Sequence, residues 1–74
     1  MKIGLVGIYN NDGTIEKINA KGYDEVEVDF KDLIGFSFDK TLRITGIGKK
    51  GCLYKLTLKS WKEIRGIYRK RGLI

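Results

Sequence analysis

The chain has no histidine, no proline and a single cysteine, Cys52. One cysteine cannot form an internal disulfide, and without histidine the usual zinc sites cannot be built. The commonest general base of enzymes is also missing. None of the serines and threonines lies in a nucleophile motif, and Cys52 falls on the apolar side of a strand pattern, where a thiol is usually inert. We therefore expect a protein that is not an enzyme and carries no cofactor.

A long apolar run is missing as well. Residues 3–9, IGLVGIY, form the longest one, which is far too short to span a membrane and has no small-residue cleavage site of a signal peptide. The run is bounded by turn residues, so we interpret it as a buried strand. The lone cysteine fits a reducing compartment. The sequence thus predicts a cytoplasmic protein that does not enter a membrane.

The length of 74 residues, with 42% hydrophobic and 32% charged residues, is typical of one small globular domain, residues 1–74. A domain of this size buries a modest core, and this one lacks a disulfide or a histidine-bound metal to stabilise it. A homo-oligomer with a shared core is one way in which the chain could gain the missing stability.

Alternating apolar residues predict strands over most of residues 3–59. Asp12-Gly13 is a hairpin signal. Residues 25–31 alternate with an acidic outer face, and residues 33–38 alternate with Ile34, Phe36 and Phe38 on one face. Residues 41–47 and 52–59 are expected to form a hairpin. The predicted fold class is α+β: a small curled or barrel-like antiparallel sheet of about five or six strands with one C-terminal helix.

The C-terminal helix is predicted over about residues 61–71. Ser60 and Glu63 match the S-x-x-E capping box, and Trp61, Ile64, Ile67 and Tyr68 fall on one face at helical spacing. Gly72 is placed as the residue that ends the helix, with Leu73 after it.

Two patterns suggest sites but have simpler explanations. Residues 46–51 match G-x-G-x-x-G, yet they are followed by a strand pattern rather than a helix, so the glycines suit a hairpin with positive φ angles better than a dinucleotide site. Glu25, Glu27 and Asp29 line one strand face and would suit a hard cation, but such a row is also an ordinary solvated face. We assign no metal site.

Charge is divided unevenly along the chain. Residues 1–39 hold four lysines and eight acids, a net charge of −4, whereas residues 40–74 hold eleven cations and Glu63 alone, a net charge of +10. A concentration of cations with almost no acid is typical of phosphate-backbone binding. The predicted nucleic-acid-binding residues are Lys62, Arg65, Arg69, Lys70 and Arg71 of the helix and Arg43, Lys49, Lys50, Lys55 and Lys59 of the hairpin.

The expected function is therefore non-catalytic binding of DNA or RNA, largely through the phosphate backbone. The alternative is a small protein-interaction module, a regulator, inhibitor or self-assembling subunit. In this case the acidic half of one copy would dock the basic half of the next, head to tail, or the basic half would dock an acidic protein.

The order of strands, basic hairpin and closing helix resembles small SH3-like chromatin proteins. The stretch VEVDFKDLIGFSFDKTLRITGIGKKGCLYKLTLKSW, about half of the chain, is similar to LytTR-type DNA-binding domains, and bacterial PH-like domains share its layout. The resemblance rests on alternation, so no site residue is taken from it.

Overall fold

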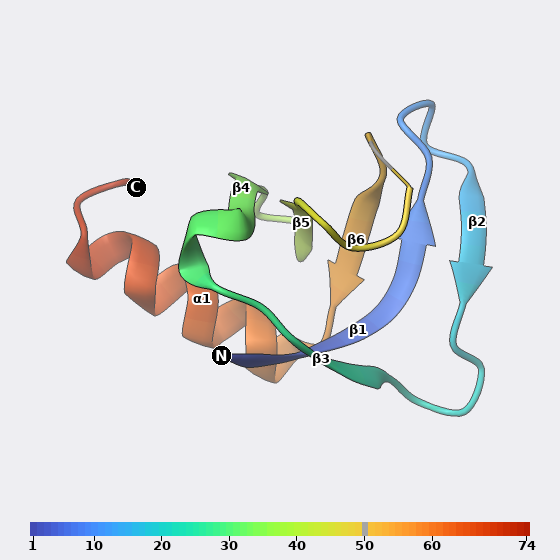
Figure 1. Ribbon diagram of the computed structural model, residues 1–74, viewed down its shortest axis with the longest axis horizontal. Helices are drawn as coiled ribbons and strands as arrows, with labels where there is room; N and C mark the ends of the chain where they lie inside the picture. Colours follow the sequence, from blue (N-terminus) through green and yellow to red (C-terminus); the bar gives the residue numbers. More distant parts are fainter. Residues whose placement is uncertain (50) are drawn as a thin grey trace.

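The computed structural model describes residues 1–49 and 51–74. Its elements follow one another as β1 (Lys2–Tyr9), β2 (Ile15–Ile18), β3 (Asp24–Glu27), the 3-10 helix η1 (Phe30–Asp32), β4 (Leu33–Phe36), β5 (Thr41–Ile44), β6 (Leu53–Leu56) and α1 (Leu58–Lys70) (Figure 1). Every strand pairing is antiparallel, and the six-stranded sheet curls without closing. The predicted α+β class and C-terminal helix are confirmed.

The long strand β1 organises the sheet. It pairs with β6, with β2 through residues 7–9, and with β3 through residues 2–5, while β5 joins β6 to β4. The turn between β1 and β2 is closed by two hydrogen bonds, from Asn10 N–H to the Thr14 carbonyl and from Gly13 N–H to the Asn10 carbonyl. Gly13 has φ +86°, so the hairpin predicted from Asp12-Gly13 is confirmed.

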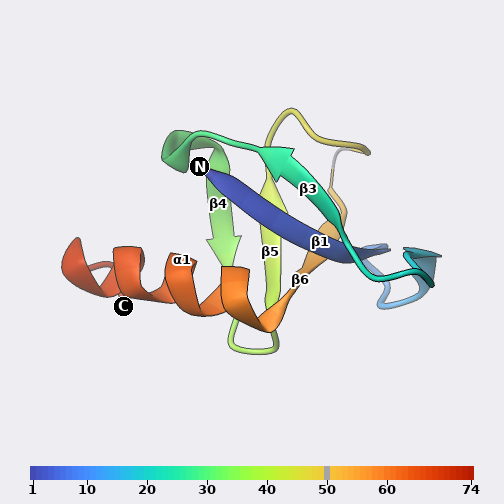
Figure 2. The same ribbon diagram turned by 90° about the horizontal axis from the view of Figure 1, so that it is seen from below.

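The core lies between the inner face of the curled sheet and α1. Ile3, Leu42, Tyr54, Leu56 and Ile64 are almost completely buried. The helix contributes Ser60, Ile64 and Tyr68, one residue per turn on a single stripe, as the helical spacing predicts. Figure 2 shows α1 crossing one end of β4, β5 and β6, with the loop after β5 at the opposite end.

The alternation predicted for β5 and β6 is confirmed, because Leu42, Ile44, Cys52, Tyr54 and Leu56 are all buried. The glycine motif between these strands forms a loop that leads into β6. Its glycines at 46, 48 and 51 have positive φ angles, as expected of a connection between strands. No helix follows the motif, so the geometry of a dinucleotide site is absent from this segment.

The start of the helix was predicted three residues too late. Thr57, not Ser60, is the N-cap: its hydroxyl accepts a hydrogen bond from Ser60 N–H at 3.2 Å. The strand before it ends at Leu56, so Leu58 and Lys59 belong to the helix and not to the sheet. The capping-box interpretation failed because a threonine three residues earlier offers the same oxygen, while the hydroxyl of Ser60 bonds elsewhere.

The end of the helix follows the prediction. Gly72 has φ +70°, its N–H bonds to the Arg69 carbonyl at 3.1 Å, and Leu73 N–H bonds to the Tyr68 carbonyl at 2.9 Å. These two bonds form a Schellman motif, which requires a residue in the left-handed conformation at the position of Gly72.

The phase predicted for residues 33–38 is wrong. Leu33 is buried, whereas Ile34 is 61% exposed and Phe38 is 72% exposed. The register against β5 shifts between Leu33 and Gly35, and such an irregularity breaks strict alternation. The even period assumed for residues 33–38 therefore fails at Ile34, which lies at this shift, and at Phe38, which lies in the turn after β4 ends at Phe36.

The acidic side chains of the first half are mostly solvated. Glu27 pairs with the N-terminal ammonium at 2.8 Å, and Asp24 accepts a hydrogen bond from Asn19. Within residues 1–49 and 51–74, no three histidine, cysteine, aspartate or glutamate side chains gather as a metal ion would require. No helix in this part of the chain is long and apolar enough to cross a membrane.

Candidate nucleic-acid interface

The solvent side of α1 is strongly basic. Five cations lie on this helix against one acid, Glu63: Lys59, Lys62, Arg65, Arg69 and Lys70. Lys62, Arg65 and Arg69 form one stripe along it, spaced three and four residues apart, and at about 1.5 Å per residue this stripe is roughly 10 Å long. In the part of the chain that the structure describes, none of the five makes an ion pair. Their charges are therefore not neutralised by ion pairs among the described residues.

Arg65 is held in place by the only tryptophan. Its guanidinium lies over the Trp61 ring at 4.6 Å from the centroid. The Trp61 ring in turn stacks on Phe36 of β4, with centroids 6.1 Å apart and planes 10° from parallel. A guanidinium supported by an aromatic ring has fewer orientations to lose when it binds an anion. Arg65 is thus the most rigidly placed cation of the stripe.

The turn between β4 and β5 lies beside the first turns of the helix. Trp61 Nε1 donates a hydrogen bond to the Ser37 carbonyl at 3.1 Å, and the Lys40 carbonyl accepts one from Leu56 N–H at 2.8 Å. Phe38 and Lys40 belong to this turn, which lies beside the start of α1 (Figure 2). Neither residue was predicted as part of the site.

The charge of Lys40 was a usable signal, since it opens the basic half of the sequence. Phe38 gave none, because the alternation placed it on the same strand face as Ile34 and Phe36. Asp39 lies on the same turn and brings a negative charge to it: its carboxylate accepts hydrogen bonds from Thr41 N–H at 3.3 Å and from the Thr41 hydroxyl. The hydrogen bond from the Thr41 hydroxyl is the main cause that lowers the pKa of Asp39 below its usual value.

Lys59, which was predicted on the hairpin, lies on α1, and the other predicted hairpin cations are not part of the helix surface. Arg43 donates to the Gly51 carbonyl at 3.2 Å and to Asn11 Oδ1 at 3.1 Å, so its guanidinium holds two loops together. Lys55 lies over the Tyr9 ring on the outer face of the sheet. Lys49 pairs with Glu16 at 3.0 Å at the end of the sheet away from the helix. Lys50 lies outside the described residues.

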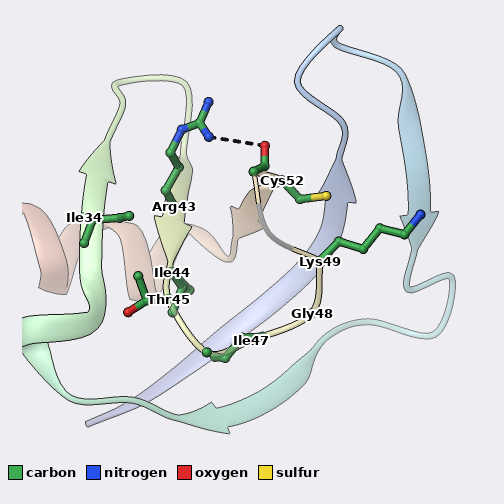
Figure 3. Close-up of a pocket in the computed structure, with 10 residues that line it drawn as sticks. Ile34, Arg43, Ile44, Thr45, Ile47, Gly48, Lys49 and Cys52 are labelled. Atoms are coloured by element: carbon green, nitrogen blue, oxygen red, sulfur yellow. Dashed lines mark hydrogen bonds between the residues drawn. The ribbon is translucent and has the colours of Figure 1, made fainter.

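Figure 3 shows the surroundings of Arg43 and Lys49: a hollow of about 280 Å³ between β5 and the glycine-rich loop, lined mainly by apolar groups such as Ile34, Ile44 and Ile47. The Lys49 side chain points away from the hollow toward β2. Its bond to Glu16 raises the pKa of Lys49 and lowers that of Glu16. The structure therefore separates the predicted residues into a helix group, Arg43 and Lys49 at the glycine-rich loop, and Lys55 on the outer face of the sheet.

Arg71 was predicted as part of the site, and Cys52 is the single cysteine of the sequence. Arg71, which follows the helix, lies over the Phe30 ring at 3.9 Å from its centroid. Burial is the main cause that raises the pKa of the Cys52 thiol, with the Glu16 carboxylate adding to it. A buried thiol that holds its proton is a poor nucleophile. The rings of Tyr54 and Tyr68 are buried as well, so they cannot stack on a base.

Comparison of the chain with protein-family models, with curated proteins and with solved structures finds no match. The function is therefore inferred from the geometry of the chain itself. That geometry combines a stripe of uncompensated cations, an arginine stacked on an aromatic cluster and an adjacent turn with an exposed ring. It suits contact with a chain of phosphates.

Proposed function

We propose that the protein binds nucleic acid without catalysis, through the phosphate backbone, and that the solvent side of α1 is the contact surface. The observation that supports this most directly is the charge of that surface: five cations and one acid, with no ion pair among the described residues to neutralise them. An ordinary solvated helix face mixes both signs, because intrahelical pairs of opposite charge are stabilising. A face of one sign is typical of a polyanion partner.

The test is a titration of nuclease-treated protein against a labelled duplex and a labelled single strand over a range of salt concentrations. Three to five phosphate contacts predict that the logarithm of affinity for a duplex falls with the logarithm of salt at a slope of about −3 to −4.5. Binding that does not depend on salt would contradict phosphate contact.

A matched pair of variants localises the surface. Reversing Lys62, Arg65 and Arg69 to glutamate lowers the net charge from +6 to 0, since three charges change by two units each. Reversing the exposed Lys17, Lys21 and Lys31 makes the same change elsewhere. We expect the first variant to lose binding and the second to retain most of it. Equal losses would mean that net charge alone, not the helix, determines affinity.

The acidic first half supports a second candidate function, docking to another protein or to another copy of this chain. Asp24, Glu25 and Glu27 are exposed on β3, and Ile15 and Ile18 are exposed on β2 at the end of the sheet order. Head-to-tail contact of this surface with α1 would join opposite charges. Oligomers that form at low salt without nucleic acid and dissociate at high salt would favour this function.

A further inference from the structure

Phe38 is the most exposed of the large apolar side chains that the structure describes, at 72%. Single exposed apolar residues are ordinary on protein surfaces and need no explanation by themselves. Phe38 differs because hydrogen bonds hold its turn and because the rings of Phe36 and Trp61 connect it to Arg65 of the basic stripe. Both features determine which groups of a ligand the Phe38 ring can contact.

The turn is fixed on both sides of Phe38. Ser37 N–H bonds to the Thr41 carbonyl at 3.1 Å, and the Ser37 carbonyl accepts the indole N–H of Trp61. On the other side Asp39 caps Thr41, and Lys40 adopts φ +67°. These bonds hold the backbone that carries the ring, so the turn loses little conformational entropy when a ligand binds.

The ring itself keeps a free face. Phe38 meets Phe36 edge to face, with centroids 5.6 Å apart and planes at 82°. A T-shaped contact covers at most one face of a ring, so at least one face of Phe38 is open to solvent. Phe36 also stacks on Trp61, which supports Arg65. One aromatic cluster therefore connects an open ring to a cation of the stripe.

An open aromatic ring beside phosphate-binding cations distinguishes between two kinds of nucleic acid. In a duplex the base faces are stacked on one another and cannot reach a protein ring without being unstacked. In a single strand they are accessible, and aromatic rings beside a cationic track are how single strands are usually held. We propose that the nucleic acid is single-stranded and that an unpaired base stacks on Phe38 while Lys62, Arg65 and Arg69 contact the flanking phosphates. This inference rests on the proposed function.

The experiment compares labelled oligothymidylate, oligouridylate and a duplex of the same length by fluorescence anisotropy. Stacking is worth about 1–3 kcal/mol per base, which corresponds to a loss of roughly 5- to 150-fold for Phe38→Ala on the single strands. Duplex affinity should change less than about twofold. Ile15→Ala, at a side chain 55% exposed on β2, is the control and should leave both unchanged. The two single strands show whether DNA or RNA is preferred.

A second variant tests stacking directly. Phe38→Trp keeps a large ring and should retain single-strand affinity, and its added fluorescence should be quenched by a single strand but not by the duplex. Wild-type affinity in Phe38→Ala, with binding still lost on reversal of Lys62, Arg65 and Arg69, would overturn the stacking inference and leave phosphate binding standing. Absence of binding to all three ligands at low salt would overturn the proposed function, and the inference with it.

Discussion

The hydroxyl of Ser60 accepts a hydrogen bond from the backbone N–H of Gly4 at 2.7 Å, in a buried position and across 56 residues of sequence. The Gly4 carbonyl in turn accepts Thr57 N–H at 3.0 Å. Both polar groups of one residue in β1 thus bond to the segment that starts α1. A Cβ atom at Gly4 would lie 2.8 Å from Thr57 Cγ2, so the close approach requires glycine.

Replacing Ser60 with alanine would leave the buried Gly4 N–H without its partner. The cost of an unsatisfied buried donor is about 1–3 kcal/mol, so Ser60→Ala should lower the free energy of unfolding by that amount. Glu63→Gln is the matched control: a capping box would make Glu63 important, whereas an exposed residue should change stability by less than about 0.5 kcal/mol. Urea unfolding measures both variants. A larger loss in Glu63→Gln than in Ser60→Ala would restore the capping box.

Thr57 supplies the N-cap, so Thr57→Ala should destabilise the protein by about 0.5–2 kcal/mol. Thr57→Ser keeps the capping oxygen and should recover most of that loss. Circular dichroism during urea unfolding provides the measurement. If the serine variant is as unstable as the alanine variant, the methyl group of Thr57 against Gly4, rather than the cap, is what stabilises the junction.

The elements that alternate or repeat cleanly could be predicted from the sequence. β5, β6 and the helical stripe of Ile64 and Tyr68 follow the periods of a strand and a helix, because their residues meet one continuous core. Prediction failed at two places where tertiary contacts, rather than the local period, determine which side chain is buried or which hydrogen bond it makes. The register shift in β4 reversed Ile34, and the bond to Gly4 determined the role of Ser60.

The candidate site also has a part that local spacing predicts and a part that depends on tertiary contacts. Helical spacing was enough to place Lys62, Arg65 and Arg69 on one stripe, since that depends on local geometry alone. The position of the glycine-rich loop depends on how the chain folds back, and the sequence did not indicate that Lys49 would meet Glu16 at the far end of the sheet. Phe38 was missed because β4 ends at Phe36, so Phe38 falls in the turn before β5, where strand alternation no longer applies.

Stability should fall at alkaline pH because of two buried phenols. Burial raises the pKa of Tyr54 and Tyr68 above the usual value of 10.0. Tyr68 donates to the Leu33 carbonyl at 2.8 Å, and Tyr54 donates to the Ile47 carbonyl. The unfolded chain ionises near pH 10 while the folded chain keeps both protons, so the contribution is complete below pH 10 and is lost as pH rises through the folded values.

The measurement is the melting temperature between about pH 8 and pH 11. Tyr68→Phe keeps the ring but cannot ionise, so it should be less stable at neutral pH and lose less stability on the alkaline side than the wild type. Parallel curves for the two proteins would show that Tyr68 does not contribute to the alkaline loss.

The two groups of predicted cations should differ in their effect on nucleic-acid binding. Arg65→Gln removes a charge that is supported by Trp61 and faces solvent, so we expect about a fivefold to tenfold loss of affinity and a shallower salt slope by nearly one unit. Lys49→Gln removes a charge already paired with Glu16 at the far end of the sheet, so we expect less than a twofold change. Anisotropy titrations of both variants at three salt concentrations compare the slopes directly. Equal losses in affinity and slope would mean that the ligand extends from the helix around the sheet to the glycine-rich loop, and the contact surface would then include both groups.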